Sequence, residues 1–169
     1  ISIHYFAGNH DMWLVDYFQK ELNLTVHNKP KIFTINDKKF FVGHGDGLGP
    51  GDKSFKIMKK IFKNPFFNWC FRCVHPDLGI KLGKYLSNKN RLKSSLENLK
   101  FNGNENEWLT KYCKEKLKNE HYDYFIFGHR HIPLEIKLSP NSTYINLGDW
   151  ITHFSYAVFD GHQVLLDKD

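Results

Sequence analysis

The chain has 169 residues, of which 41% are hydrophobic and 25% are charged, and its formal net charge is +6. This length and apolar content suit one buried core, so we expect a single domain over residues 1–169. No apolar run approaches the roughly 18 residues of a transmembrane helix, which excludes a helical membrane span within these residues.

The first predicted element is a strand over residues 3–6, where an aromatic and aliphatic run leads to a glycine. The residues that follow are polar: Asn9, His10 and Asp11. Amide, imidazole and carboxylate groups gathered at a strand end are candidate ligands for a divalent cation. Apolar residues at helical spacing then predict a helix over residues 13–22.

A β-hairpin is predicted next, with arms over residues 31–35 and 38–42 and a turn at Asn36-Asp37. The second arm, like the first strand, ends at a glycine and leads directly into a histidine, His44. The order of strand, glycine and polar group therefore occurs for a second time.

Residues 52–101 differ in composition from their surroundings and predict an inserted helical unit. From residue 53 to residue 100, twelve Lys and Arg residues stand against two acidic ones, a net +10, so the rest of the chain carries −4. Apolar residues recur at helical spacing in its first part, and lysines fill the other face. They are Phe55, Met58, Ile61, Phe62 and Phe66.

A lysine-rich helix face is usually a solvated surface, and an aromatic stripe is usually part of a core. The insert nevertheless has more apolar surface than a small helical unit buries. Basic amphipathic helices suit nucleic acid or an anionic lipid surface. The helical spacing of the aromatic residues favours a hydrophobic groove over base stacking.

The last part of the chain predicts one helix and five strands. The helix carries an apolar stripe from Trp108 to Leu117, and an aromatic run over residues 124–127 predicts a buried strand. This strand ends at a glycine, after which His129 and His131 stand one residue apart. Short strands are predicted over residues 134–138, 143–146, 154–159 and 163–166. The mixture predicts an α/β fold.

The three cysteines do not form a disulfide framework, so we expect a reducing, cytoplasmic compartment. Cys70 and Cys73 are spaced as in a zinc knuckle, but Cys113 stands alone and leaves such a site without four ligands. We therefore expect three buried thiols that bind no metal.

The three segments of strand, glycine and polar group resemble a known set of motifs. They read Gly8-Asn9-His10-Asp11, Gly43-His44-Gly45-Asp46 and Gly128-His129-Arg130-His131. In this order they resemble the third, fourth and fifth motifs of the calcineurin-like metallophosphoesterases. The resemblance implies a four-layer α/β/β/α sandwich in which residues 52–101 form an inserted helical lid. It also implies that the domain is N-terminally incomplete, because the family's Asp-x-His and Gly-Asp-x-x-Asp motifs come before the first of these segments.

The resemblance also implies a role for particular residues. Two divalent metal ions, with Mn²⁺ as the expected metal, would bind the substrate's phosphate. The implied metal ligands are Asn9, His44, His129 and His131. His10 would act beside the phosphate as the catalytic residue. The implied substrate-binding residues of the lid are Asp52, Ser87, Lys89 and Arg91. Asp149 also follows a glycine, but its place after the last motif excludes it as the family's bridging aspartate.

Within this family, the lid directs the resemblance to a lipid A pathway hydrolase that splits the pyrophosphate of a UDP-linked diacylglucosamine into a lipid monophosphate and UMP. It implies a glycolipid substrate, no nucleic acid partner, and a cytoplasmic protein peripheral to the inner membrane; the oligomeric state is left open. Two other functions stay open. One is a different phosphodiesterase or a nuclease, which would use the basic insert on nucleic acid. The other is a non-catalytic binding protein with a decayed site.

Overall fold

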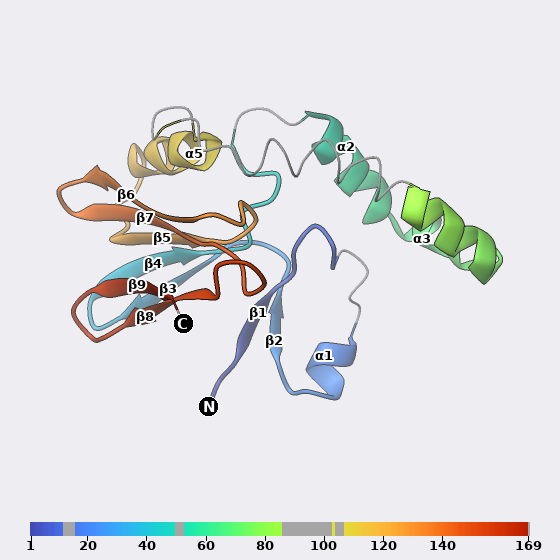
Figure 1. The fold of residues 1–169 in the computed structure, drawn as a ribbon, viewed down its shortest axis with the longest axis horizontal. Coiled ribbons are helices and arrows are strands. Elements are labelled where there is room, and N and C mark those ends of the chain that lie inside the picture. Colours follow the sequence, from blue (N-terminus) through green and yellow to red (C-terminus); the bar gives the residue numbers. More distant parts are fainter. Residues whose placement is uncertain (12–15, 50–52, 86–102, 104–106, 169) are drawn as a thin grey trace.

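A computed structural model describes residues 1–11, 16–49, 53–85, 103 and 107–168 (Figure 1). It is a mixed α/β structure around a five-stranded sheet with the order β3-β4-β5-β7-β6. These strands are β3 (Lys31–Ile35), β4 (Lys38–Val42), β5 (Tyr124–Phe127), β6 (Pro133–Ser139) and β7 (Ser142–Leu147). Strands β4, β5 and β7 are parallel neighbours, so their C-terminal ends lie at one edge of the sheet.

The hairpin predicted around Asn36-Asp37 is confirmed. Strands β3 and β4 pair antiparallel with Ile35 opposite Lys38, which leaves a turn of two residues. Both turn residues have positive φ, 47° and 61°, as the commonest two-residue hairpin turn requires.

Two small sheets complete the strands. β1 (His4–Phe6) pairs parallel with β2 (Thr25–His27), and β8 (Ser155–Phe159) pairs antiparallel with β9 (Val164–Lys168). β2 was not predicted. Of the helix predicted over residues 13–22, the structure has α1 (Tyr17–Lys20), while residues 12–15 lie outside the described part.

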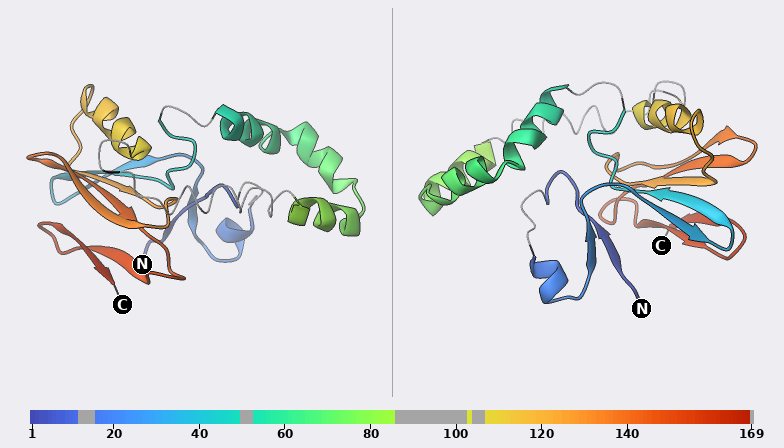
Figure 2. Two further views of the ribbon diagram at one scale, coloured as in Figure 1. Left: turned by 45° about the horizontal axis from the view of Figure 1, so that its top comes forward. Right: turned by 180° about the vertical axis from the view of Figure 1, so that it is seen from behind.

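The two faces of the central sheet pack against different partners (Figure 2). Helix α5 (Trp108–Leu117) covers one face through Leu109 and Cys113, which contact a core that includes Phe125. The other face packs against β8 and β9 through a second core around Phe40 and Ile145. Because both faces are buried, the parallel strands β4 and β5 carry apolar residues at successive positions. The described elements thus form three layers, and the fourth layer of the sandwich stays a prediction.

The insert is helical where it is described. α2 (Lys53–Phe62), α3 (Pro65–Arg72) and a helical segment over residues 76–85 extend away from the sheet (Figures 1 and 2). Helix α3 begins at Pro65 because Asn64 acts as its N-cap and accepts a hydrogen bond from the Phe66 backbone N–H at 2.9 Å.

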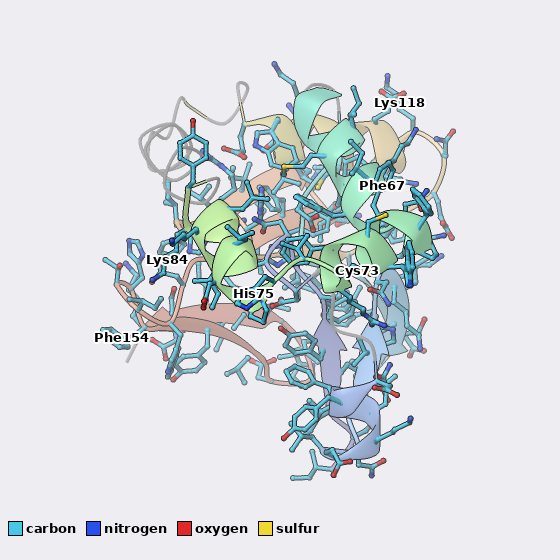
Figure 3. All side chains as sticks on the ribbon, turned by 90° about the vertical axis from the view of Figure 1, so that its right-hand side faces the viewer. Phe67, Cys73, His75, Lys84, Lys118 and Phe154 are labelled. Atoms are coloured by element: carbon cyan, nitrogen blue, oxygen red, sulfur yellow. The ribbon has the colours of Figure 1, made fainter. Side chains whose placement is uncertain are left out.

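The described helices of the insert carry large apolar side chains that are exposed to solvent. They are Ile57, Ile61, Phe66, Phe67, Trp69, Leu78, Ile80, Leu82 and Tyr85. Figure 3 views this side of the molecule, with Phe67 and Cys73 on the insert. Cys113 is buried as predicted and Cys70 is half-buried, but the prediction was wrong for Cys73, which is exposed because the helices of the insert do not pack into the core. In the described part of the chain, no helix is long and apolar enough to cross a membrane.

Candidate metal centre

Three predicted ligands meet where the strands end. His44 and His129 follow the neighbouring parallel strands β4 and β5, and Asn9 follows β1. Asn9 Oδ1 lies 3.1 Å from His44 Nε2 and 3.3 Å from His129 Nδ1. The two imidazole rings are 5.2 Å apart and meet edge to face.

Two of the separations between donor atoms suit one divalent ion. Ligands bound to one cation at about 2.1 Å stand roughly 3.0–3.4 Å from one another when the angle between them is about 90–110°. The separations from Asn9 Oδ1 to the two ring nitrogens fall in this range. Within the described residues, no group of three or more His, Cys, Asp or Glu side chains is arranged to hold a metal. The cluster of Asn9, His44 and His129 is not such a group because one of its three donors is an amide.

Gly8 allows the His44 ring to approach the chain. A Cβ atom on Gly8 would lie 2.7 Å from two atoms of that ring, which is closer than real Cβ contacts. We predict that Gly8→Ala displaces His44 and weakens binding of Mn²⁺ or Zn²⁺ at least tenfold, measured by calorimetric titration. The matched control is Gly83→Ala, because a Cβ atom there meets nothing within 4 Å. Equal metal affinity in the two variants would contradict this account of Gly8.

Burial keeps both imidazoles neutral. It lowers the pKa of His44, and it lowers the pKa of His129 to about 4, with the nearby His44 adding to the effect. A neutral imidazole is the form that binds a metal.

The lowered pKa of His129 predicts a dependence of stability on pH. The unfolded chain protonates this residue near pH 6.5 and the folded chain only near pH 4, so the free energy of unfolding should fall as the pH drops through this window. Between pH 7 and pH 5 we expect His129 to account for a loss of about 2 kcal/mol. Urea unfolding of the metal-free protein and of His129→Asn at both pH values measures it. An equal loss in the variant would show that His129 is not the source.

A buried ion pair holds the loop that carries His129 and His131. Arg130, between the two histidines, donates its Nε–H to both carboxylate oxygens of Glu107, at 3.0 and 3.1 Å. Both side chains are almost fully buried, at 5% and 2% exposure. The two histidines have positive φ, 66° and 53°, a conformation that costs free energy in non-glycine residues and is often found at functional sites.

His131, whose charge acts on both His44 and His129, also faces a further partner. Its Nδ1 is 3.7 Å from Asp149 Oδ2, and His153 Nδ1 is 3.5 Å from the same oxygen. Burial raises the pKa of Asp149, but hydrogen bonds from three backbone N–H groups outweigh burial and lower the pKa to about 2. The sequence analysis assigned no role to Asp149 or His153. Asp149 nevertheless follows a strand and a glycine, as the assigned ligands do.

Two lysines of α2 join the insert to the segment that follows His44. Lys59 pairs with Asp46, whose side chain is 4% exposed, and the Lys56 Nζ donates to the Gly49 carbonyl oxygen at 2.6 Å. These two lysines are therefore not part of a purely solvated face, because the start of α2 lies against the segment that follows His44.

The remaining predicted residues divide into two groups. His10 is described and exposed, next to Asn9 in the turn after β1. The four predicted substrate-binding residues lie outside the described part of the chain: Asp52, Ser87, Lys89 and Arg91. Their roles stay predictions, as do those of the metal ligands.

The parallel strands β4 and β5 thus place two neutral imidazoles beside the amide of Asn9, a set of donors that suits a divalent metal ion. No protein-family model matches the chain. The chain is 37% identical to a UDP-2,3-diacylglucosamine hydrolase of Porphyromonas gingivalis, over 99% of this chain and 69% of the relative. The chain therefore belongs to the UDP-2,3-diacylglucosamine hydrolase family.

Further relatives carry the same name. Those of Wigglesworthia glossinidia brevipalpis and Pseudomonas putida are 28% and 24% identical over 88% of this chain, which spans 58% and 62% of their lengths. Among solved structures, the solution NMR structure of a Thermotoga maritima protein matches 99% of this chain and 76% of that one, with a TM-score of 0.37 and 15% identity. That similarity is too low to support an argument about the fold.

Proposed function

We propose that this chain is the larger part of an enzyme that hydrolyses the pyrophosphate of UDP-2,3-diacylglucosamine, giving the lipid monophosphate and UMP in lipid A biosynthesis. The observation that carries the proposal is that Asn9, His44 and His129, far apart in the sequence, meet around one point. The relatives named for this reaction align with the chain over nearly its whole length. The domain would be the four-layer sandwich with its lid over residues 52–101.

Two divalent ions, Mn²⁺ by preference, would bind at this edge of the sheet. Asn9, His44 and His129 would hold one of them, and His131 would help to hold the other, together with an Asp, a His and a bridging Asp from the family's two preceding motifs. When bound, such a pair of ions stabilises charge on the phosphate and makes a water molecule nucleophilic at neutral pH.

The protein's own groups would orient the substrate and move a proton. His10 is exposed beside Asn9, so its imidazole is accessible to a bound phosphate. It would stabilise developing negative charge or give a proton to the leaving oxygen. In the lid, Lys89 and Arg91 would neutralise the pyrophosphate, Arg91 through two parallel hydrogen bonds, with Asp52 and Ser87 completing the contacts to substrate.

The lid would hold the acyl chains of the substrate. Its exposed apolar side chains, such as Phe66 and Trp69 at 63% exposure each, have no place in the described core. The lysines of α2 join the start of the lid to the site, so a lipid held by the lid would lie near the metals. The basic charge of the insert would attract the anionic surface of the inner membrane on its cytoplasmic side.

The test uses a polypeptide that carries the two preceding motifs in addition to this chain. With Mn²⁺ it should convert UDP-2,3-diacylglucosamine to UMP and the lipid monophosphate, and chelation should abolish turnover. Cleavage of nucleic acid, with binding that weakens steeply as salt rises, would favour the nuclease function instead. Absence of both activities, together with tight ligand binding, would favour a binding protein.

A further inference from the structure

The carboxylate of Asp149 is fixed on one side by its own loop. Its Oδ1 accepts hydrogen bonds from the backbone N–H groups of Ile151, Thr152 and His153, at 3.0, 2.5 and 3.2 Å. The side chain is 11% exposed. Three donors on one oxygen leave the carboxylate little freedom to rotate, so the direction of the second oxygen is set by the loop.

The second oxygen faces two imidazoles. Asp149 Oδ2 lies 3.7 Å from His131 Nδ1 and 3.5 Å from His153 Nδ1. Because Nδ1 of His131 is turned toward the carboxylate, Nε2 of the same ring faces away from Asp149. The two oxygens of the Asp149 carboxylate therefore have separate partners: the loop backbone for Oδ1 and the imidazoles for Oδ2.

Topology places this carboxylate at the same edge as the candidate metal centre. Asp149 follows β7, and β7 is the parallel neighbour of β5, which leads into His129 and His131. Asp149 is thus the fourth polar group that a strand and a glycine deliver to this edge.

We infer that Asp149 is a positioning residue for the metal centre: its Oδ2 accepts the Nδ1–H of His131 and so keeps the Nε2 lone pair free for a divalent cation. The separation of 3.7 Å is longer than a hydrogen bond, and a small rotation of the exposed His131 side chain closes it. A carboxylate behind a metal-binding imidazole fixes its tautomer and orientation. The inference rests on the proposed function in giving His131 a metal.

A purely structural role for Asp149 is the alternative, and the two roles require different atoms. Holding the loop requires only an acceptor at the Oδ1 position, which asparagine also provides. Positioning His131 requires an acceptor at the Oδ2 position, where Asp149→Asn places an N–H₂ group. Asp149→Asn therefore preserves the loop and presents a hydrogen-bond donor to His131 in place of an acceptor.

The chain offers a matched control in the turn between β8 and β9. Asp160 Oδ1 accepts the backbone N–H groups of His162 and Gln163, both at 2.8 Å, in the same manner as Asp149 in its own loop. Asp160→Asn therefore measures the effect of the same substitution in a loop that holds none of the candidate ligands.

The first readout is the tautomer of His131, measured by long-range ¹H–¹⁵N correlation in the metal-free protein at about pH 8.5, where an ordinary imidazole is neutral. The His131 signals are assigned by their loss in His131→Gln. We expect mainly the Nδ1–H form in the wild-type protein and mainly the Nε2–H form in Asp149→Asn. His153→Ala removes the second imidazole at Oδ2 and should keep or increase the Nδ1–H form.

The second readout is the Mn²⁺ affinity of the polypeptide that also carries the two preceding motifs, because His131 alone does not hold the second ion. This affinity should fall about 10–100-fold in Asp149→Asn and stay unchanged in Asp160→Asn. An unchanged tautomer and affinity in Asp149→Asn would overturn the inference and leave Asp149 as a support for its loop. A changed tautomer in a protein that never hydrolyses the substrate would support the placement of Asp149 and count against the proposed function.

Discussion

Residues 1–169 on their own should not hydrolyse UDP-2,3-diacylglucosamine at a measurable rate, and excess Mn²⁺ should not restore turnover. The reason is the set of ligands these residues contain. Asn9, His44 and His129 supply three donors for one ion, whereas the second ion would have only His131 of the assigned ligands, and both ions would lack the bridging carboxylate. One imidazole does not hold Mn²⁺ firmly against water, and the two-ion arrangement needs the bridge. Losing stabilisation worth several kcal/mol slows a reaction at least 10³-fold.

The comparison protein is the polypeptide that also carries the Asp-x-His and Gly-Asp-x-x-Asp motifs, assayed beside residues 1–169 at equal concentration. Circular dichroism of the shorter protein establishes that it is folded, so that inactivity is attributable to the missing ligands. A His44→Ala variant of the longer protein should be as inactive as the shorter one, because it too loses one of the two ions. Robust turnover by residues 1–169 would show that the assignment of the motifs is wrong.

The sequence predicted the local elements of the site better than its spatial arrangement. The alternation of strand, glycine and polar group located Asn9, His44 and His129 because a strand end is a local feature with a local signal. That β4 and β5 lie side by side and parallel is a tertiary fact, which the sequence pattern does not contain. The sequence also carried the signal for Asp149, a polar group after a strand and a glycine. Asp149 was set aside because its place after the last motif excluded it as the bridging aspartate, although other roles were open.

Residues that support the site were harder to predict than those that form it. Arg130 stands between two candidate ligands, and nothing local indicates that it reaches Glu107, which lies before α5. Lys59 has the appearance of a surface lysine on an amphipathic helix, yet it pairs with the buried Asp46. Both contacts join segments distant in the sequence. The charge pattern along one helix does not predict which distant residue each charged side chain contacts.

Glu107→Gln should destabilise the protein by roughly 3–5 kcal/mol, because it leaves the Arg130 guanidinium buried without its counter-charge. For a chain of this length the melting temperature should fall by roughly 10 °C. The matched control is Glu115→Gln, which removes an exposed pair with Lys118 in which both side chains are 68% exposed. Such pairs contribute about 0–1 kcal/mol.

The buried pair is also expected to connect stability with metal binding. Arg130 stands between His129 and His131, both in the left-handed conformation, so the contact with Glu107 holds a strained loop in place. Glu107→Gln should therefore weaken Mn²⁺ binding as well as lower the melting temperature, measured by calorimetric titration below the transition. Replacing both partners, Glu107→Leu with Arg130→Met, should recover much of the stability because no buried charge is left unpaired. If Glu107→Gln behaves like Glu115→Gln in both measurements, the Arg130–Glu107 pair neither stabilises the fold nor holds the histidines, and the positive φ angles at the site need another cause.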